Sequence, residues 1–232
     1  MAKTSQSAEV ISKLKAMSNP ENVAGMARFG INPERTLGIS IPVLRTIAKE
    51  LGKNHQLALE LWDSGIHEAR ILASFVDDPR QITQKQMDAW VKDFDSWDVC
   101  DQCCSNLFDK TPFAFSKALE WSENEEQFVK RAGFTLMACL AVHDKKAKNL
   151  QFEAFLPHIV RGASDDRNFV KKAVNWALRQ IGKRNLHLNR KAIEASESIK
   201  RLDSKSARWI ASDALRELTS KAVQERLTQK AQ

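Results

Sequence analysis

The chain has 232 residues, which is enough for one large or two small domains with a substantial apolar core. Hydrophobic residues make up 43% and charged residues 28%, an ordinary composition for a soluble globular protein. No apolar run approaches the roughly 18 to 20 residues that span a membrane, and the polar start MAKTSQSAEVISKLKAM lacks the apolar region of a secretory signal, so we expect a cytoplasmic protein.

The formal net charge of +7 is distributed unevenly along the chain. Residues 128–190 hold thirteen Lys or Arg against four Asp or Glu, a net +9, and the rest of the chain has a net charge of −2. On adjacent helices such charges would form a positive stripe, which attracts polyanions and makes their binding dependent on salt. The alternative is a mildly basic surface with no specific partner.

Apolar residues recur at intervals of three and four almost throughout, and runs of β-branched residues with period-two alternation are missing, so the pattern predicts helices. Segment 128–142, FVKRAGFTLMACLAV, is largely apolar and predicts a buried inner helix. Short polar turns contain Asn, Asp or Ser that can cap the next helix: SNPEN at 18–22, DDPR at 77–80, GASDD at 162–166 and GKRN at 182–185.

Five segments resemble one another and start 30, 31, 41 and 37 residues apart: HEARILASFVDD from 67, WDVCDQCCSNLFDK from 97, FVKRAGFTLMACLAVHD from 128, FVKKAVNWALRQIGK from 169 and SARWIASDALREL from 206. This interval suits one helix pair per repeat, as in a HEAT-like solenoid whose repeats bury their faces by stacking. No linker or break in composition divides the chain. We therefore expect a single all-α domain over residues 1–232, a HEAT-like superhelix (an α-α solenoid) with a concave basic face.

The motif WDVCD holds the first candidate site. Trp97 and Asp101 are four residues apart, so in a helix they share a face and could contact one small ligand. Asp98 follows Ser96 near an expected helix start, where an acid is favoured as a cap or by the helix dipole. The simpler interpretation is a half-buried indole beside a surface carboxylate.

A second candidate site lies in FVKKAVNWALR, where Trp176 is surrounded by Lys171, Lys172 and Arg179. Aromatic rings among cations suit nucleic acids, because rings stack on bases while Lys and Arg hold phosphates. Arg131, in the otherwise apolar FVKRAGF, must either reach outward or serve a ligand. Each of these residues, taken alone, is also compatible with a structural role.

Together, WDVCD, FVKRA and FVKKAVNWALR resemble the motifs of the AlkD-like DNA alkylation repair family, and NPENVAGMARFG and GISIPVLR resemble its amino-terminal helices. The resemblance covers most of the chain. It implies a HEAT-like-repeat DNA glycosylase that excises bases alkylated at ring nitrogens, chiefly N3 and N7 purine adducts, from duplex DNA without a metal or cofactor. We expect a monomer, associated with the nucleoid through DNA binding.

The resemblance also assigns roles to individual residues. It places the catalytic carboxylate at Asp101, aromatic contacts to the lesion nucleotide at Trp97 and Trp176, and a cation that binds the DNA backbone at Arg131. Further backbone contacts are expected from the neighbouring basic residues and from the arginine of GISIPVLR, namely Lys171, Lys172, Arg179 and Arg45.

Two positions depart from the family pattern. Phe29 replaces a tyrosine, so it keeps a ring for substrate contact but loses a hydroxyl, and Ser96 replaces a second tryptophan. These changes leave room for an altered substrate range or for absent excision. Two rival functions therefore stay open: a non-catalytic scaffold that binds damaged duplex, and a HEAT-type protein-interaction module.

The pair Cys100 and Cys103 forms a C-x-x-C motif, which can mark zinc or redox sites. No second cysteine pair or well-spaced histidine pair completes a four-ligand set. Cys139 and His143 share a face of an apolar helix, where core packing is the simpler explanation. The sequence therefore predicts no metal site.

Overall fold

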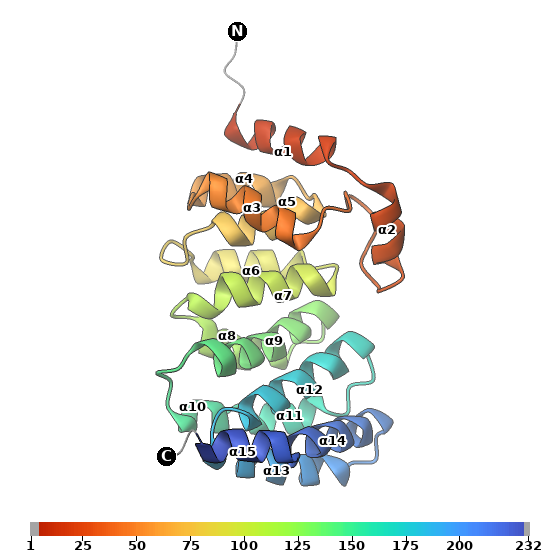
Figure 1. Ribbon diagram of the computed structural model, residues 1–232, viewed down its shortest axis with the longest axis vertical. Coiled ribbons are helices and arrows are strands. Elements are labelled where there is room, and N and C mark those ends of the chain that lie inside the picture. The colour runs from red at the N-terminus through yellow and green to blue at the C-terminus, as the bar shows by residue number, and fades with distance from the viewer. Residues whose placement is uncertain (1–4, 230–232) are drawn as a thin grey trace. The chain divides into compact units, whose positions relative to one another are not determined.

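The computed structural model describes residues 5–229 (Figure 1). Every regular element in these residues is a helix, which confirms the predicted all-α class. Over the same residues, no helix combines the length and apolar character needed to cross a membrane. By its contacts the chain divides into two compact units, residues 1–111 (unit 1) and residues 112–232 (unit 2), and each is described by itself.

Unit 1 consists of seven α-helices and one short 3-10 helix among its described residues: α1 (Gln6–Ala16), α2 (Pro20–Ala27), α3 (Ile41–Leu51), α4 (His55–Asp63), α5 (His67–Val76), α6 (Gln84–Lys92), α7 (Trp97–Asn106) and η1 (Phe108–Lys110). α5 packs against α3, α4 and α7. The indole of Trp62 stacks on that of Trp90, with ring centroids 4.0 Å apart, and its Nε1 donates a hydrogen bond to Asp93. This aromatic pair joins α4 to α6.

Unit 2 contains eight helices among its described residues: α8 (Ala114–Ser122), α9 (Gln127–His143), α10 (Asn149–Glu153), α11 (Leu156–Gly162), α12 (Asn168–Gly182), α13 (Leu186–Lys200), α14 (Lys205–Leu218) and α15 (Lys221–Gln229). α9 packs extensively against α8 and α12, and most of its residues are buried, as predicted for segment 128–142. Gly133 allows the close approach of α8, because a Cβ there would overlap the backbone of Trp121 and Ser122.

The four predicted turns lie between helices, and at two of them an Asn side chain caps the helix that follows. Asn19, in the first turn, caps α2 by accepting hydrogen bonds from the amides of Glu21 and Asn22, and Pro20 occupies the first helical position. Asn185, in the last turn, caps α13 by accepting a hydrogen bond from the Leu188 amide at 2.9 Å. The other two turns separate α5 from α6 and α11 from α12, but their residues do not cap the next helix. α6 is capped by Thr83, which follows the turn, and α12 has no side-chain cap.

The five similar segments coincide with five helices, here called the repeat helices: α5, α7, α9, α12 and α14. They start at residues 67, 97, 127, 168 and 205, within one residue of the starts expected from the sequence. Between consecutive repeat helices lies at least one further helix, which gives the helix pairs of a repeat protein. The predicted helix pairs are present at three of the four intervals, and between α9 and α12 two short helices, α10 and α11, take the place of one.

Candidate functional site

The first turns of α7 hold the candidate catalytic residues of unit 1. Trp97 is the first residue of the helix and Asp101 lies one turn further on, so the two share a face. Both side chains are half-buried, which leaves part of the indole and part of the carboxylate in contact with solvent. The structure thus places the predicted carboxylate and the predicted aromatic residue one turn apart on the same face of α7.

A buried ion pair anchors this end of α7 to α5. His67 Nε2 lies 2.9 Å from Asp98 Oδ2, and the two residues are 4% and 8% exposed. Burial alone would lower the pKa of His67, but the hydrogen bond to Asp98 and the charges of Asp98, Glu68 and Asp95 raise it above its usual value. Asp98 therefore acts through packing and charge, and it orients the turn that carries Trp97 and Asp101.

Phe29 follows α2 and is held beside Trp97. The indole Nε1 of Trp97 donates a hydrogen bond to the Phe29 carbonyl at 3.1 Å, and the Phe29 ring is 74% exposed. Both rings line a groove of about 420 Å³, here called the Phe29 groove, together with Met26, Ile39 and Ser40. The structure therefore brings two of the three predicted substrate-binding rings into one groove.

Ser96, one of the two departures from the family pattern, is fully buried and fixes the segment after Phe29. Its Oγ accepts a hydrogen bond from the Asn32 amide at 2.9 Å, and the Asn32 side chain donates to Asp95 at 2.8 Å. A hydroxyl at this position therefore has a structural use, since it ties the Phe29 segment to the start of α7.

Glu68 supports the other wall of the Phe29 groove. Its buried carboxylate accepts hydrogen bonds from the amides of Leu37 at 2.8 Å, Gly38 at 2.6 Å and Ile39 at 3.2 Å. Gly38 has a φ of 81°, and a Cβ there would overlap the Asn19 carbonyl oxygen, so glycine is required. The pattern gave no hint of this contact, because Glu68 is about 30 residues from the loop that it binds.

Arg45, predicted to bind the DNA backbone, lies in a different groove of unit 1. This groove of about 330 Å³, here called the Lys53 groove, is also lined by Lys49, Lys53 and Lys110. The Arg45 guanidinium lies 4.6 Å from the centroid of the Phe75 ring and donates hydrogen bonds to Gln102 and Asn106. Arg45 is thus an exposed cation in a basic cluster, a position suited to a phosphate.

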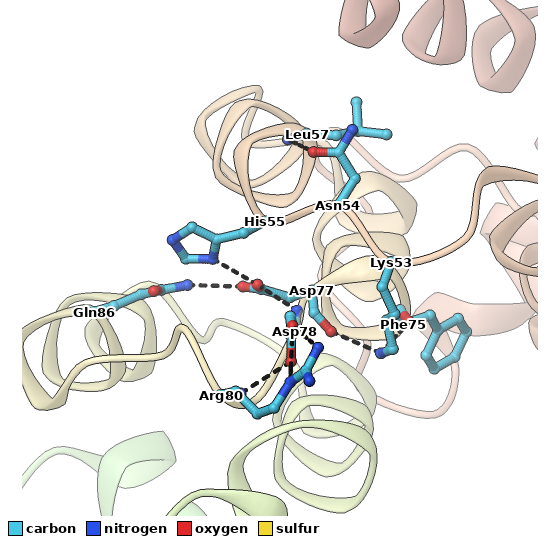
Figure 2. A network of polar contacts seen from close by, with 9 residues as sticks. All are labelled: Lys53, Asn54, His55, Leu57, Phe75, Asp77, Asp78, Arg80 and Gln86. Carbon is cyan, nitrogen blue, oxygen red and sulfur yellow. Dashed lines mark hydrogen bonds and ion pairs between the residues drawn. The ribbon is translucent and has the colours of Figure 1, made fainter.

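Figure 2 shows how Lys53 is held in this cluster. Its ammonium donates hydrogen bonds to the carbonyls of Phe75 at 2.9 Å and Asp77 at 2.7 Å, and the Asp77 carboxylate contacts His55 and Gln86. Burial and the charge of Lys110 lower the pKa of Lys53, while Asp77 and Asp78 oppose that change. Lys53 therefore caps the end of α5 as well as adding charge to the groove.

In unit 2, α12 carries Trp176 on the same face as Lys172 and Arg179, at helical spacings of four and three. Trp176 is half-buried and Lys172 is exposed. Arg179 lies 2.5 Å from Glu217 and 3.6 Å from Asp213, both on α14. Its charge is balanced by these carboxylates, a pairing with residues 34 and 38 positions away that the sequence did not reveal.

Arg131 lies within the packing of α9 against α12. Its side chain is 5% exposed, and its guanidinium donates a hydrogen bond to the Phe169 carbonyl at 2.6 Å. The rings of Phe128 and Phe169 contact each other nearby, with centroids 5.6 Å apart. The structure thus gives Arg131 a role in joining two repeat helices. Its side chain does not have the outward orientation expected of a cation that binds the DNA backbone.

Trp209, on α14, is a candidate that the sequence reasoning missed. Its indole is 44% exposed, and the Lys171 ammonium lies 5.1 Å from the ring centroid. The residues that follow it, Ile210 and Ala211, are buried, so Trp209 is out of phase with the apolar face of its helix. This position, outside the apolar face of the helix, was the sequence signal that could have identified Trp209. The contact with Lys171 places an exposed aromatic ring beside a cation in unit 2.

The six tryptophans fall into two groups by exposure. Trp62, Trp90 and Trp121 are 2 to 4% exposed and serve the core. The remaining three reach the surface: Trp97, Trp176 and Trp209. The first two are the tryptophans that the motifs identified.

The four cysteines are all buried, and none of them forms a disulfide: Cys100, Cys103, Cys104 and Cys139. Burial raises the pKa of Cys103 well above its ordinary value, the opposite of the shift that a reactive thiol needs. The C-x-x-C motif is therefore part of the core of unit 1.

Stacked helix pairs define the protein as a helical-repeat protein, and a solved structure shares the fold. The two have a TM-score of 0.70 and 20% sequence identity over 90% of this chain and 93% of the other, whose description is "a new family of proteins related to the HEAT-like repeat DNA glycosylases with affinity for branched DNA structures". The predicted HEAT-like fold is confirmed. A family model described as DNA alkylation repair enzyme matches residues 10–218, so the chain belongs to that family.

Two bacterial relatives are similar over the same share of the chain. An uncharacterized protein of Listeria innocua, Lin0241, is 26% identical over 192 residues, and one of Listeria monocytogenes, Lmo0209, is 24% identical over 192 residues. Each similarity covers 81% of this chain and 83% of the relative. Neither name adds an activity to the family assignment.

Proposed function

We propose that this protein is a metal-independent DNA glycosylase, which hydrolyses the N-glycosidic bond of cationic N3- and N7-alkylated purines in duplex DNA. The observation that carries the proposal is the arrangement on α7, where half-buried Asp101 shares a helix face with Trp97, and Trp97 lines a groove with Phe29. A carboxylate one helical turn from an indole that lines this groove matches two demands of the reaction.

The first demand is stabilisation of the sugar. A purine alkylated at N3 or N7 already carries a positive charge, so it can leave without being protonated. As the bond between C1′ and the base nitrogen breaks, the electron pair goes to the purine, which leaves neutral, and C1′ acquires oxocarbenium character. Ionised Asp101 stabilises that charge and orients a water molecule, whose oxygen bonds to C1′ while its proton passes to the carboxylate or to solvent.

The second demand is selection of the charged base. An indole face attracts a cation with about 0.5 to 2 kcal/mol, so Trp97 would favour a cationic purine over a neutral one. Phe29 supplies a second ring in the same groove. We propose that Trp176 contributes a further aromatic contact from unit 2.

DNA binding is proposed to depend mainly on unit 2. Residues 112–232 contain 23 Lys or Arg against 14 Asp or Glu, a net charge of +9. Lys172, which is exposed, and Lys171, beside Trp209, are suited to contact phosphates. Binding of this kind weakens steeply as salt rises, whereas a protein-interaction module would bind its partner without such dependence on DNA and salt.

The test is incubation of methylated duplex DNA with wild type and with Asp101→Asn, followed by chromatography of the released bases. We expect 3-methyladenine and 7-methylguanine from wild type and a loss of about 100-fold or more in the variant, the scale for removing a main electrostatic stabiliser. Asp63→Asn, an exposed acid on α4 with the same charge change, is the matched control and should release bases like wild type. Equal release by Asp101→Asn and wild type would contradict the proposal.

A second candidate function is non-catalytic binding of DNA by shape. It is favoured by the described affinity of the similar solved structure for branched DNA, and by Phe29 and Ser96, which depart from the family pattern. It predicts no released base from wild type, together with tighter binding of a four-way junction than of a linear duplex of equal length.

A further inference from the structure

Unit 2 contains a basic groove that none of the roles described above uses. It measures about 440 Å³ and lies at the carboxyl ends of α9 and α12. Four cations from separate parts of the unit line it: Lys145 after α9, Lys183 and Arg184 after α12, and Arg226 on α15. Among the described residues that line it, none is Asp or Glu. It is called the Arg184 groove below.

Arg184 is fixed at the wall of this groove. Its guanidinium donates hydrogen bonds to the carbonyls of Ala141 and Ala147, both at 3.0 Å, and lies 4.2 Å from the centroid of the Phe152 ring. A guanidinium has five N–H donors, so two carbonyls leave several donors for another acceptor. Because the group is already held in place, little conformational entropy is lost when it binds an anion.

The hydrogen bonds of Arg184 to backbone carbonyls give it a structural role, but they do not explain the other cations of the groove. Lys183 contacts Glu217 at 2.6 Å, so its charge is partly balanced. Lys145 and Arg226 are exposed. Two additional cations brought to a groove without a lining carboxylate raise its positive potential, and such a potential favours an anion in a groove of this size.

We propose that the Arg184 groove binds a phosphate group of the DNA backbone. It continues the Lys171 and Trp176 cluster past the carboxyl end of α12, because Arg179 and Lys183 share Glu217. Lys171 and Lys183 are 12 residues apart on or next to α12, about 18 Å along a helix. The groove would therefore extend the DNA footprint of unit 2 beyond the residues that the motifs identify. This inference rests on the DNA binding in the proposed function but not on base excision.

The test compares salt dependence in two variants with the same charge change. Lys145→Glu with Arg226→Glu alters the groove, and Lys200→Glu with Arg201→Glu alters exposed residues at the end of α13 that do not line it. The affinity for a fluorescein-labelled, undamaged duplex is measured at several salt concentrations. Each lost phosphate contact should reduce the slope of log K against log salt by about 0.9, so we expect a reduction of about 1 for the groove variant relative to the control variant.

A second arm identifies the source of the phosphate. The thermal unfolding of wild type and both variants is measured with inorganic phosphate and with chloride at equal ionic strength. Protection by phosphate that the groove variant alone lacks, together with its reduced slope, supports the proposal. Protection without a change in slope would mean that the groove takes free phosphate and not the DNA backbone, and equal behaviour of the two variants in both arms would overturn the proposal.

These outcomes are separable from a failure of the proposed function. Base release is measured on the same preparations, and the control variant, Lys200→Glu with Arg201→Glu, should release bases at the wild-type rate. Absence of base release from every preparation, together with a reduced slope in the groove variant, would contradict the proposed glycosylase activity and still support phosphate binding by the Arg184 groove.

Discussion

Units 1 and 2 have similar numbers of residues but opposite electrostatic character. Unit 1 has 13 Lys or Arg against 15 Asp or Glu, and unit 2 has 23 against 14. The proposed catalytic acid, Asp101, lies in the slightly acidic unit, whereas the basic unit contains most of the cations available for phosphates. We infer that chemistry and affinity depend on different parts of the chain, so mutations should affect one property without the other.

The largest expected effect is on the stability of unit 1. Glu68→Ala leaves the amides of residues 37–39 without their buried acceptor, and loss of such a charged network costs about 3 to 5 kcal/mol. Denaturant titration of Glu68→Ala should show a decrease of this size in the free energy of unfolding. Glu34→Ala, an exposed acid in the same region, is the control and should change the free energy of unfolding by less than about 0.5 kcal/mol. A similar small change for Glu68→Ala would show that the loop does not depend on this carboxylate.

Removal of the exposed indoles should separate rate from affinity. If Trp97 also stabilises the positive charge that develops at C1′ in the transition state, by about 0.5 to 2 kcal/mol, Trp97→Ala lowers single-turnover base release by about 2- to 30-fold at saturating DNA. Trp209→Ala, which removes the ring beside Lys171, should instead weaken DNA binding and leave that rate unchanged. Fluorescence anisotropy measures the DNA affinity of both variants, and rapid quench measures their rate of base release. A rate defect confined to Trp209→Ala would reverse the assignment.

The pH dependence of stability should also differ between the units, with a smaller effect. The pKa of His67 in unit 1 is raised by Asp98, so its contribution to stability is complete below about pH 6.5 and is lost as pH rises through the raised pKa. In unit 2, burial and Arg161 lower the pKa of His158, so this residue opposes folding as pH falls below about 6.5.

The two histidines therefore predict opposite changes on substitution. Between pH 6 and pH 8, the free energy of unfolding of His67→Gln should decline less than that of wild type, whereas His158→Gln should decline more. Urea titrations across this range measure both. The same pH profile for wild type and His67→Gln would exclude a charged His67 and Asp98 pair.

Much of the fold follows from local patterns in the sequence. Polar turns such as SNPEN predicted helix boundaries because a cap depends on residues only two or three positions apart, as at Asn19. The repeat spacing located the five repeat helices because each must bury one apolar face against its neighbours. Trp97 and Asp101 were identified together for the same reason, since their four-residue spacing fixes a shared helix face.

The features that the sequence did not reveal depend on contacts between distant residues. Glu68 binds a loop about 30 residues away, and Arg179 pairs with carboxylates on α14. The packing of Arg131 against the Phe169 carbonyl is also non-local. Periodicity shows which face of a helix is apolar, but not which polar partner another helix supplies.

The division between chemistry and affinity is tested most directly by measuring the DNA dissociation constant and the single-turnover rate of base release on the same two variants. Asp101→Asn should reduce the rate by about 100-fold or more and keep the dissociation constant close to that of wild type. Lys171→Glu with Lys172→Glu should weaken binding and keep the rate at saturating DNA, relative to the control Lys85→Glu with Lys92→Glu on α6. A rate loss in the Lys171 and Lys172 variant, or wild-type base release by Asp101→Asn, would contradict this division.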